Sequence, residues 1–242
     1  MKHVKITAFD CPDAWFKTLY HIWNEGDDFD VLHGSEVSKT KKLNLTIEIF
    51  HPENRPLVSD KAPCDMKYIH GYALAYLWSG QKQEETYTYG SRLREPVDQI
   101  AEAVRRYSEQ LQDRQITLVI RQPTDIQPDR SLLKQEPPCL SLIDTEIVDG
   151  EMHLTCYFRS WDAYAGLPAN IAGLQIFNEA FVSEINSAGR LSIKTGKLIF
   201  HSKNCHIYER QNKLVKELLE PNNPNHSSRV LKILKETIDE KT

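Results

Sequence analysis

The chain has 242 residues, of which 40% are apolar and 26% charged, so it is long enough to bury the core of one large domain. Its net charge of −4 gives no basic surplus for a nucleic-acid partner, and no apolar run approaches the ~20 residues of a membrane-spanning helix. We expect no signal peptide. Five scattered cysteines without a CxxC pair are not typical of a disulfide framework or a zinc site. These features predict a cytoplasmic protein without a membrane or nucleic-acid partner.

The first half of the chain carries both strand and helix patterns. Residues 43–50 alternate between apolar and polar side chains, which predicts a half-buried strand. An apolar helix is expected over residues 66–78, and an amphipathic helix over residues 97–112 behind Pro96. Residues 115–120 are interpreted as a short strand.

The second half begins with a hairpin pattern. Asp149-Gly150 is a strong two-residue turn signal, which predicts that residues 140–148 and 152–158 pair as strands. Residues 170–186 are apolar nearly all round, which is typical of a helix buried at the centre of a fold. Residues 198–208 are interpreted as strand and loop.

A last amphipathic helix is expected over residues 230–238. The mixture of hairpin strands and helices predicts the α+β class. The chain shows no repeat, and we interpret residues 1–242 as a single domain.

Cys139 follows two prolines and directly precedes a predicted strand. Pro137 and Pro138 fix the backbone that leads to the thiol. Two interpretations remain open at this point: Cys139 is either a small buried side chain at a strand start or a nucleophile.

Polar residues gather after the predicted hairpin. Arg159 and Ser160 suit a phosphate, because a guanidinium group binds one through two hydrogen bonds; the alternative is a surface salt bridge between Arg159 and Asp162. Asn170 stands where the central helix should begin. It is either an N-cap or, through its amide donor and acceptor, a reader of a base edge.

Two further patterns are weaker. His206 and Tyr208 share one face of an extended segment, which suits hydrogen bonds to a sugar hydroxyl as well as a structural role. Residues 87–90 are aromatic and are interpreted as a core or edge strand.

In their order along the chain, from Tyr72 to Tyr208, these residues resemble the thymidylate synthase family, and most of all its shorter archaeal-type branch. The blocks that carry the resemblance are Tyr89-Gly90, Val97-Asp98-Gln99-Ile100, Pro137-Pro138-Cys139, Arg159-Ser160-x-Asp162, Gly166-Leu167-Pro168-x-Asn170-Ile171-Ala172 and His206-Ile207-Tyr208.

The resemblance implies a large mixed sheet with helices packed on one face, and a homodimer in which two such sheets meet. It implies an enzyme that moves a one-carbon unit from 5,10-methylenetetrahydrofolate, or a related reduced pterin, to carbon 5 of a pyrimidine nucleotide monophosphate. Cys139 would add to carbon 6 as the nucleophile. Tyr89 would help to remove the proton from carbon 5.

The resemblance also implies residues that bind the nucleotide. Arg159 and Ser160 would hold the 5′-phosphate, and Arg114 would reach the same phosphate across the dimer interface. His206 and Tyr208 would bind the sugar 3′-hydroxyl.

Three neighbouring residues would contact the base and the folate. Asn170 would read the ring nitrogen and the exocyclic oxygen of the pyrimidine. Asp162 would hold the pterin ring. Trp161 would either stack on the pterin or pack in the protein interior.

Some positions depart from the family pattern. No carboxylate stands at the position of the family's catalytic glutamate on the helix at 66–78, so Glu84 or Glu85 is the candidate replacement. Gln115 replaces the second arginine of the family's pair. The glycine- and threonine-rich phosphate loop is not recognisable in residues 34–40. We expect residues 232–242 to form a charged amphipathic helix and not the family's closing tail.

These departures leave three functions open. The first is conversion of dUMP to dTMP. The second is hydroxymethylation of a pyrimidine nucleotide on the same scaffold, and the third is nucleotide binding without catalysis. Asn170 favours a uracil nucleotide, because the cytosine-specific members of the family carry aspartate at that position.

Overall fold

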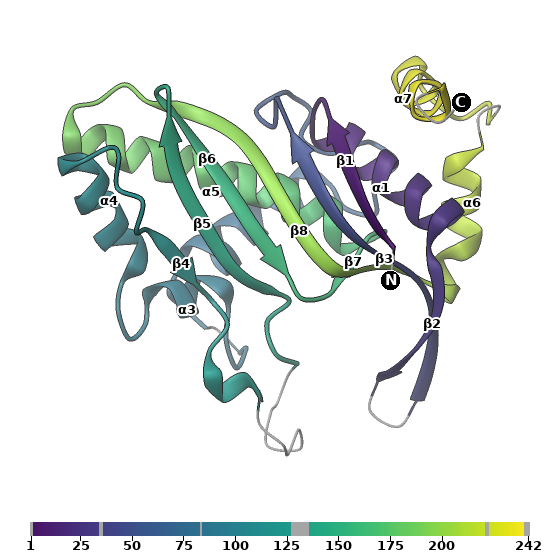
Figure 1. Ribbon diagram of the computed structural model, residues 1–242, viewed down its shortest axis with the longest axis horizontal. Coiled ribbons are helices and arrows are strands. Elements are labelled where there is room, and N and C mark those ends of the chain that lie inside the picture. Colours follow the sequence, from purple (N-terminus) through teal and green to yellow (C-terminus); the bar gives the residue numbers. More distant parts are fainter. Residues whose placement is uncertain (1, 34–35, 83, 127–135, 221–222, 240–242) are drawn as a thin grey trace.

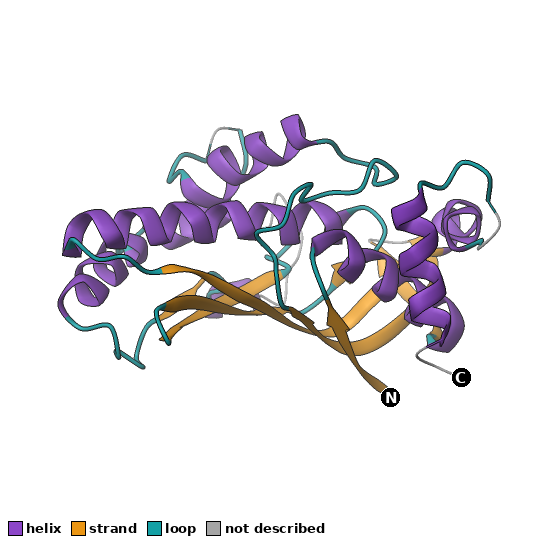
Figure 2. Ribbon diagram, turned by 90° about the horizontal axis from the view of Figure 1, so that it is seen from above, coloured by secondary structure: helices purple, strands orange, loops and turns teal. Residues whose placement is uncertain are grey.

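The computed structural model describes residues 2–33, 36–82, 84–126, 136–220 and 223–239. Its centre is one eight-stranded sheet, and the helices lie on one face of that sheet (Figure 2). Figure 1 shows the long helix α5 (Gly166–Gly189) running behind the strands. The α+β class and the large mixed sheet with helices on one face agree with the prediction.

The sheet mixes parallel and antiparallel pairs in the order β1-β3-β8-β6-β5-β4, with β2 added to β3 and β7 added to β8. The pairs β1–β3, β6–β8 and β7–β8 are parallel, and the others are antiparallel. The strands are β1 (His3–Ala8), β2 (Asp27–His33), β3 (Glu36–Ile49), β4 (Thr117–Val119), β5 (Leu140–Val148), β6 (Glu151–Phe158), β7 (Trp161–Asp162) and β8 (Lys194–Tyr208).

Helices fill the covered face of the sheet. Besides α5, they are α1 (Cys11–Glu25), α2 (Met66–Gly71), α3 (Tyr89–Arg94), α4 (Gln99–Glu109), α6 (Asn212–Leu219) and α7 (Ser228–Asp239). A π-helical segment (Tyr72–Trp78) continues α2, and two short 3₁₀ turns lie at Pro123–Ile126 and Glu209–Gln211. None of the described helices is long and apolar enough to cross a membrane.

The core lies between α5 and the sheet. Phe177 and Phe181 of α5 are 1% and 0% exposed, and Trp78 packs edge-on against Phe177 with ring centroids 5.5 Å apart. From the sheet, Met152, Leu154, Cys156 and Phe158 present one fully buried face, as their alternation predicts. Because α5 meets strands on one side and other helices on the other, it is apolar nearly all round.

Several predicted elements are confirmed with shifted ends. The predicted strand at 43–50 is the second half of β3, and the helix at 97–112 is α4. The hairpin over Asp149-Gly150 is present, with both turn residues at positive φ as a tight turn of this kind requires. β1, β2 and α1 were not predicted.

One prediction about local structure is wrong, and one of two open alternatives is excluded. Residues 87–90 are not a strand: the Thr88 side chain caps α3, which begins at Tyr89. Asn170 is not an N-cap, because α5 begins four residues earlier at Gly166 and Asn170 lies inside its first turns. Its side chain is therefore available for contacts other than the helix end.

Candidate active site

The β5–β6 hairpin brings Cys139 and Arg159 together. The register pairs Leu140 with Phe158, so the residues just outside this pair become neighbours, and the Arg159 N–H donates to the Cys139 carbonyl at 2.9 Å. Cys139 is partly exposed, as a nucleophile must be. Cys139 and Arg159 lie 20 residues apart in the chain, so the sequence alone does not show this contact.

The Arg159 side chain is anchored to the segment that carries the thiol. Its Nε donates to the Pro138 carbonyl at 2.9 Å, its Nη2 donates to the Pro137 carbonyl, and Nη2 lies 3.8 Å from the Glu136 carboxylate. The predicted alternative, a salt bridge with Asp162, is replaced by these contacts. Arg159 thus holds a positive charge beside Cys139.

Burial raises the pKa of the Cys139 thiol above its ordinary value. The positive charge of Arg159 opposes this shift, Glu136 adds to it, and Arg121 opposes it. Because burial is the largest effect, the free protein keeps Cys139 mainly as a thiol at neutral pH. The proposed nucleophile therefore depends on its cationic neighbours to ionise.

Tyr89 lies against the same backbone. Its hydroxyl accepts a hydrogen bond from the Leu140 N–H at 3.3 Å, and its side chain is 7% exposed. Burial raises the pKa of the Tyr89 phenol far above its ordinary value, with Cys139 as the next contributor. Tyr89 is therefore a protonated phenol at neutral pH, and it can relay a proton only through its hydroxyl or a water.

Two further tyrosines extend from Tyr89 toward α5. Tyr76 meets Tyr89 edge-on at 5.0 Å, and Tyr72 stacks on Tyr76 at 5.6 Å. We call Tyr72, Tyr76 and Tyr89 the tyrosine wall. Both added residues come from the π-helical segment, a conformation that is frequent at functional sites. Tyr72 and Tyr76 were not predicted as site residues, although tyrosines four residues apart on a predicted helix share one face.

The Asn170 carboxamide lies at the far end of the tyrosine wall. Its Nδ2 donates to the Tyr72 hydroxyl at 2.7 Å, and its Oδ1 accepts from the Trp161 Nε1–H at 2.9 Å. Trp161 is 2% exposed and stacks on Phe158 with ring centroids 4.2 Å apart. This burial agrees with packing in the interior rather than with stacking on a cofactor.

Strand β7 places Asp162 beside the predicted sugar-binding pair. Asp162 pairs with His206 in the sheet, and the Ala163 N–H donates to the His206 carbonyl at 2.8 Å. The Asp162 carboxylate accepts from the backbone N–H groups of Tyr164 and Ala165 and from Gln211 Nε2 at 3.0 Å. The Asp162 carboxylate is therefore held near the N-terminal end of α5 by uncharged hydrogen-bond donors.

His206 and Tyr208 share one face of β8, as predicted, and their rings meet edge-on at 4.7 Å. Burial raises the pKa of Tyr208, the negative charge of Asp162 adds to this increase, and the Arg210 guanidinium, whose Cζ lies 4.0 Å from the centroid of the Tyr208 ring, opposes it. The structure thus brings Cys139, Arg159, Asp162 and the His206–Tyr208 pair to one region.

A groove on the protein surface adjoins this region. It has a volume of 1010 Å³ and is lined by Ala165 and by residues between Pro56 and Tyr68. Ala165 follows Asp162 by three residues. The groove does not include Cys139, so it is a space beside the thiol region rather than around it.

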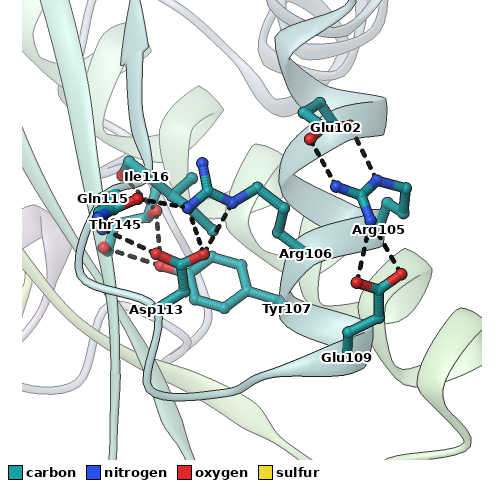
Figure 3. A network of polar contacts seen from close by, with 9 residues as sticks. All are labelled: Glu102, Arg105, Arg106, Tyr107, Glu109, Asp113, Gln115, Ile116 and Thr145. Atoms are coloured by element: carbon teal, nitrogen blue, oxygen red, sulfur yellow. Dashed lines mark hydrogen bonds and ion pairs between the residues drawn. The ribbon is translucent and has the colours of Figure 1, made fainter.

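Arg114 is the predicted site residue that the structure keeps apart. It is exposed in the turn between α4 and β4, where Arg106 binds Asp113 and Gln115 on either side of it (Figure 3). Thr117, three residues further on, pairs with Asp144 of β5. Four residues of strand, about 13 Å, separate Asp144 from Leu140, so Arg114 does not reach Cys139 of its own chain.

Three other predictions concern residues near this region. Ser160 follows Arg159 directly and is half-buried. Glu84 and Glu85 are exposed in a turn before α3, and no contact brings either of them to the thiol in the part of the chain that the structure describes. Of residues 34–40, Gly34 and Ser35 lie outside the described residues, and the rest belong to β3.

Comparison with known proteins identifies one family and relatives that carry the same name. A family model described as "Thymidylate synthase" matches residues 16–241. The chain is 32% identical over 217 residues to a protein of Methanosarcina acetivorans, covering 88% of this chain and 94% of that protein. It is 29% identical over 237 residues to a protein of Methanothermobacter thermautotrophicus, covering 88% and 97%. Both relatives carry the name "Putative thymidylate synthase".

Proposed function

The chain belongs to the thymidylate synthase family, and from this premise we propose that it transfers a one-carbon unit to carbon 5 of a pyrimidine nucleotide monophosphate, converting dUMP to dTMP. The observation that carries the proposal is the contact between Cys139 and Arg159, which a backbone hydrogen bond joins. The Tyr89 hydroxyl lies beside them, since it accepts a hydrogen bond from the N–H of Leu140, the residue after Cys139. A nucleophile, an anion-binding cation and a proton relay are the parts that this reaction needs.

Cys139 is the proposed nucleophile. Its thiolate adds to carbon 6 of the pyrimidine, and the electron pair displaced from the ring double bond makes carbon 5 nucleophilic. After carbon 5 has bonded to the one-carbon unit, its proton leaves through the Tyr89 hydroxyl or an adjacent water. As that proton is lost, the bond between the one-carbon unit and the pterin nitrogen breaks, which leaves an exocyclic methylene on carbon 5. A hydride from the reduced pterin, which becomes oxidised to the dihydro form, then adds to this methylene, and expulsion of the Cys139 thiolate restores the ring double bond.

Arg159 and Ser160 are the proposed phosphate ligands. The Arg159 guanidinium now donates to the Pro137 and Pro138 carbonyls, and it keeps further N–H groups for two phosphate oxygens. His206 and Tyr208 are the proposed ligands of the sugar hydroxyl, which their shared face supports.

The co-substrate in this proposal is 5,10-methylenetetrahydrofolate or a related reduced pterin, which supplies the one-carbon unit and, for dTMP, a hydride. Asp162 is the proposed partner of the pterin ring. Its position beside His206 and next to the 1010 Å³ groove supports this role, because the groove offers space for the rest of the co-substrate. Trp161, predicted as a second pterin contact, is buried and is not given that role.

We further propose a homodimer with shared active sites. Among the residues that the structure describes, the helices leave one face of the sheet uncovered (Figure 2). Exposed polar contacts, such as Thr46 Oγ1 to His201 Nδ1 at 2.9 Å, lie between neighbouring strands of the sheet. A second sheet packed there would bring Arg114 to a site that is not its own. The separation of Arg114 from Cys139 within one chain supports this arrangement.

Hydroxymethylation is the second candidate. Helix α7 packs on α1, with Val230 and Leu234 buried and Arg229 paired with Asp10. In the family a closing tail excludes water from the intermediate, and a site closed differently admits water to the exocyclic methylene. Binding without catalysis is disfavoured by the partly exposed Cys139 beside Arg159, which a binding protein does not need.

Tritium release from carbon 5 tests the proposal. Labelled dUMP, dCMP, UMP and CMP are each incubated with the full chain, with and without methylenetetrahydrofolate. We expect release from dUMP that requires the folate and is lost in Cys139→Ser, while this variant still binds dUMP. The mass of the product separates methyl from hydroxymethyl. If the folded protein binds a nucleotide but releases no tritium from any of the four, the catalytic proposal is wrong.

A further inference from the structure

We infer that Trp161 and Tyr72 fix the orientation of the Asn170 carboxamide, and that this fixed orientation makes the site select a 4-oxo pyrimidine (uracil) over a 4-amino pyrimidine (cytosine). The inference rests on the proposed function, in which Asn170 contacts the base. It adds two positioning residues that set which base is accepted, and both are outside the set expected to touch the nucleotide.

Asn170 by itself does not distinguish the two bases. Its carboxamide has an acceptor oxygen and a donor nitrogen of nearly the same shape. In one orientation it complements the N3–H donor and the C4 oxygen of uracil. Rotated by 180°, it complements the N3 acceptor and the C4 amino group of cytosine. An asparagine that rotates freely therefore serves both bases.

Trp161 removes this freedom. Its indole Nε1–H is a donor only, so the group 2.9 Å from it must be the Asn170 oxygen. The reversed amide would set two donors against each other. Trp161 cannot move aside, since it is 2% exposed and stacks on Phe158 with an interplanar angle of 3°. Its donor is thus a fixed reference for the amide.

Tyr72 holds the other end of the amide. Its hydroxyl accepts from Asn170 Nδ2 at 2.7 Å. A hydroxyl can donate as well as accept, so Tyr72 alone would tolerate either orientation, whereas Trp161 would not. The Asn170 amide keeps one lone pair on its oxygen and one N–H for a ligand. Trp161 and Tyr72 therefore leave one acceptor and one donor of the Asn170 amide available to bind a base.

The direction of the amide selects uracil. Its nitrogen points to the tyrosine wall, which runs from Tyr72 through Tyr76 to Tyr89, the residue proposed to act at carbon 5. The C4 substituent is the neighbour of carbon 5 on the ring, so it lies on the nitrogen side of Asn170. A donor there requires an acceptor on the base, which is the C4 oxygen of uracil, and the amide oxygen then meets N3–H.

The test uses Trp161→Phe, which removes the indole donor and keeps an aromatic ring. Dissociation constants of dUMP and dCMP are measured by calorimetry on the full chain, so the readout does not depend on turnover. We expect wild type to prefer dUMP, and the preference to fall by about ten- to a hundredfold in Trp161→Phe, because the reversed amide no longer leaves a donor unpaired. Tyr72→Phe should reduce the preference less.

Phe200→Leu is the matched control. Phe200 packs on Trp161 with ring centroids 5.3 Å apart, so its loss disturbs the same cluster without removing the indole donor. It should leave the ratio of the two dissociation constants unchanged even if both weaken.

The outcomes separate the inference from the proposed function. A wild-type preference for dCMP, or an unchanged ratio in a folded Trp161→Phe, overturns the inference and leaves Cys139 chemistry standing. Failure of wild type to bind any of the nucleotides overturns the proposed function, and the inference falls with it.

Discussion

Mixing two inactive variants tests whether the active sites are shared between subunits. Arg114→Ala removes the arginine proposed to reach the phosphate across the interface, and Cys139→Ser removes the nucleophile. Each variant alone should release little tritium from carbon 5 of dUMP. A mixture that exchanges subunits should regain activity, because one site of each heterodimer contains both native residues.

The expected recovery follows from the position of Arg114. Within one chain the strand β5 alone places about 13 Å between Leu140 and Asp144, and Arg114 lies beyond that point. If Arg114 acts only across the interface, random exchange of equal amounts makes half of the dimers heterodimers with one working site each. The mixture should therefore show about one quarter of the wild-type activity.

Arg105→Ala supplies the control. Arg105 is exposed on α4, near Arg114 in the sequence, and it pairs with Glu102 and Glu109 rather than with any site residue (Figure 3). Mixed with Cys139→Ser, it should give about half of the wild-type activity, which is simple dilution. The reasoning is refuted if heterodimers purified through two affinity tags contain both Arg114→Ala and Cys139→Ser subunits and remain inactive.

Three further predictions address the base, the thiol and the core. Asn170→Asp should shift the preference from dUMP toward dCMP in the tritium assay, because a carboxylate accepts from the amino group of cytosine; an unchanged preference would mean that another residue reads the base. The rate at which iodoacetamide alkylates Cys139 should rise with pH, and the midpoint of this rise should lie above that of an ordinary cysteine, because burial raises the pKa of the thiol. Glu136→Gln should lower the midpoint and Arg159→Gln should raise it. The opposite order would contradict the electrostatic assignment. Phe177→Ala should lower the free energy of unfolding in urea by about 3–5 kcal/mol, and a loss under 1 kcal/mol would show that the core closes over the cavity.

Periodicity was sufficient to predict part of the elements that build the core. The alternation over residues 152–158 and the apolar helix that became α5 follow directly from burying one face of a strand and all sides of a central helix. The Asp149-Gly150 turn also fixed the hairpin, because its two residues accept positive φ. β1 was missed because it is short and its pairing partner, β3, lies about 40 residues further along the chain. α1 was missed although Asp10 caps it and Pro12 stands in its first turn, which is a helix-start signal that the local sequence does contain.

The candidate site needed more than periodicity. The resemblance to a family supplied Cys139, Arg159 and Asn170, whereas each residue alone had an ordinary structural interpretation. The structure then added Tyr72 and excluded the N-cap alternative for Asn170, which has a hydrogen-bonded position inside α5. Contacts between residues that lie 98 positions apart in the chain cannot be read from local pattern.

The places where the regular pattern fails are the places that build the site. In β8 the core-facing residues change from even to odd numbers between Ser202 and Cys205, where the pairing with β3 shifts register. This bulge turns His206 and Tyr208 to the face opposite Cys205; with an unbroken period of two they would have shared the core face of Ser202.

Two further irregularities lie in β5 and in the helical segment at 66–78. The register shift between Leu140 and Leu142 places Leu140 on the core side, so Cys139 is left partly exposed; without it, Cys139 would share the core-facing parity of Ile143. The π-helical segment likewise brings Tyr72 to Asn170. A bulge and a π-helix each give up regular hydrogen bonding, and all three irregularities direct a polar or reactive side chain to one region. A variant that lacks the extra residue of either bulge should therefore still fold but should no longer bind the nucleotide.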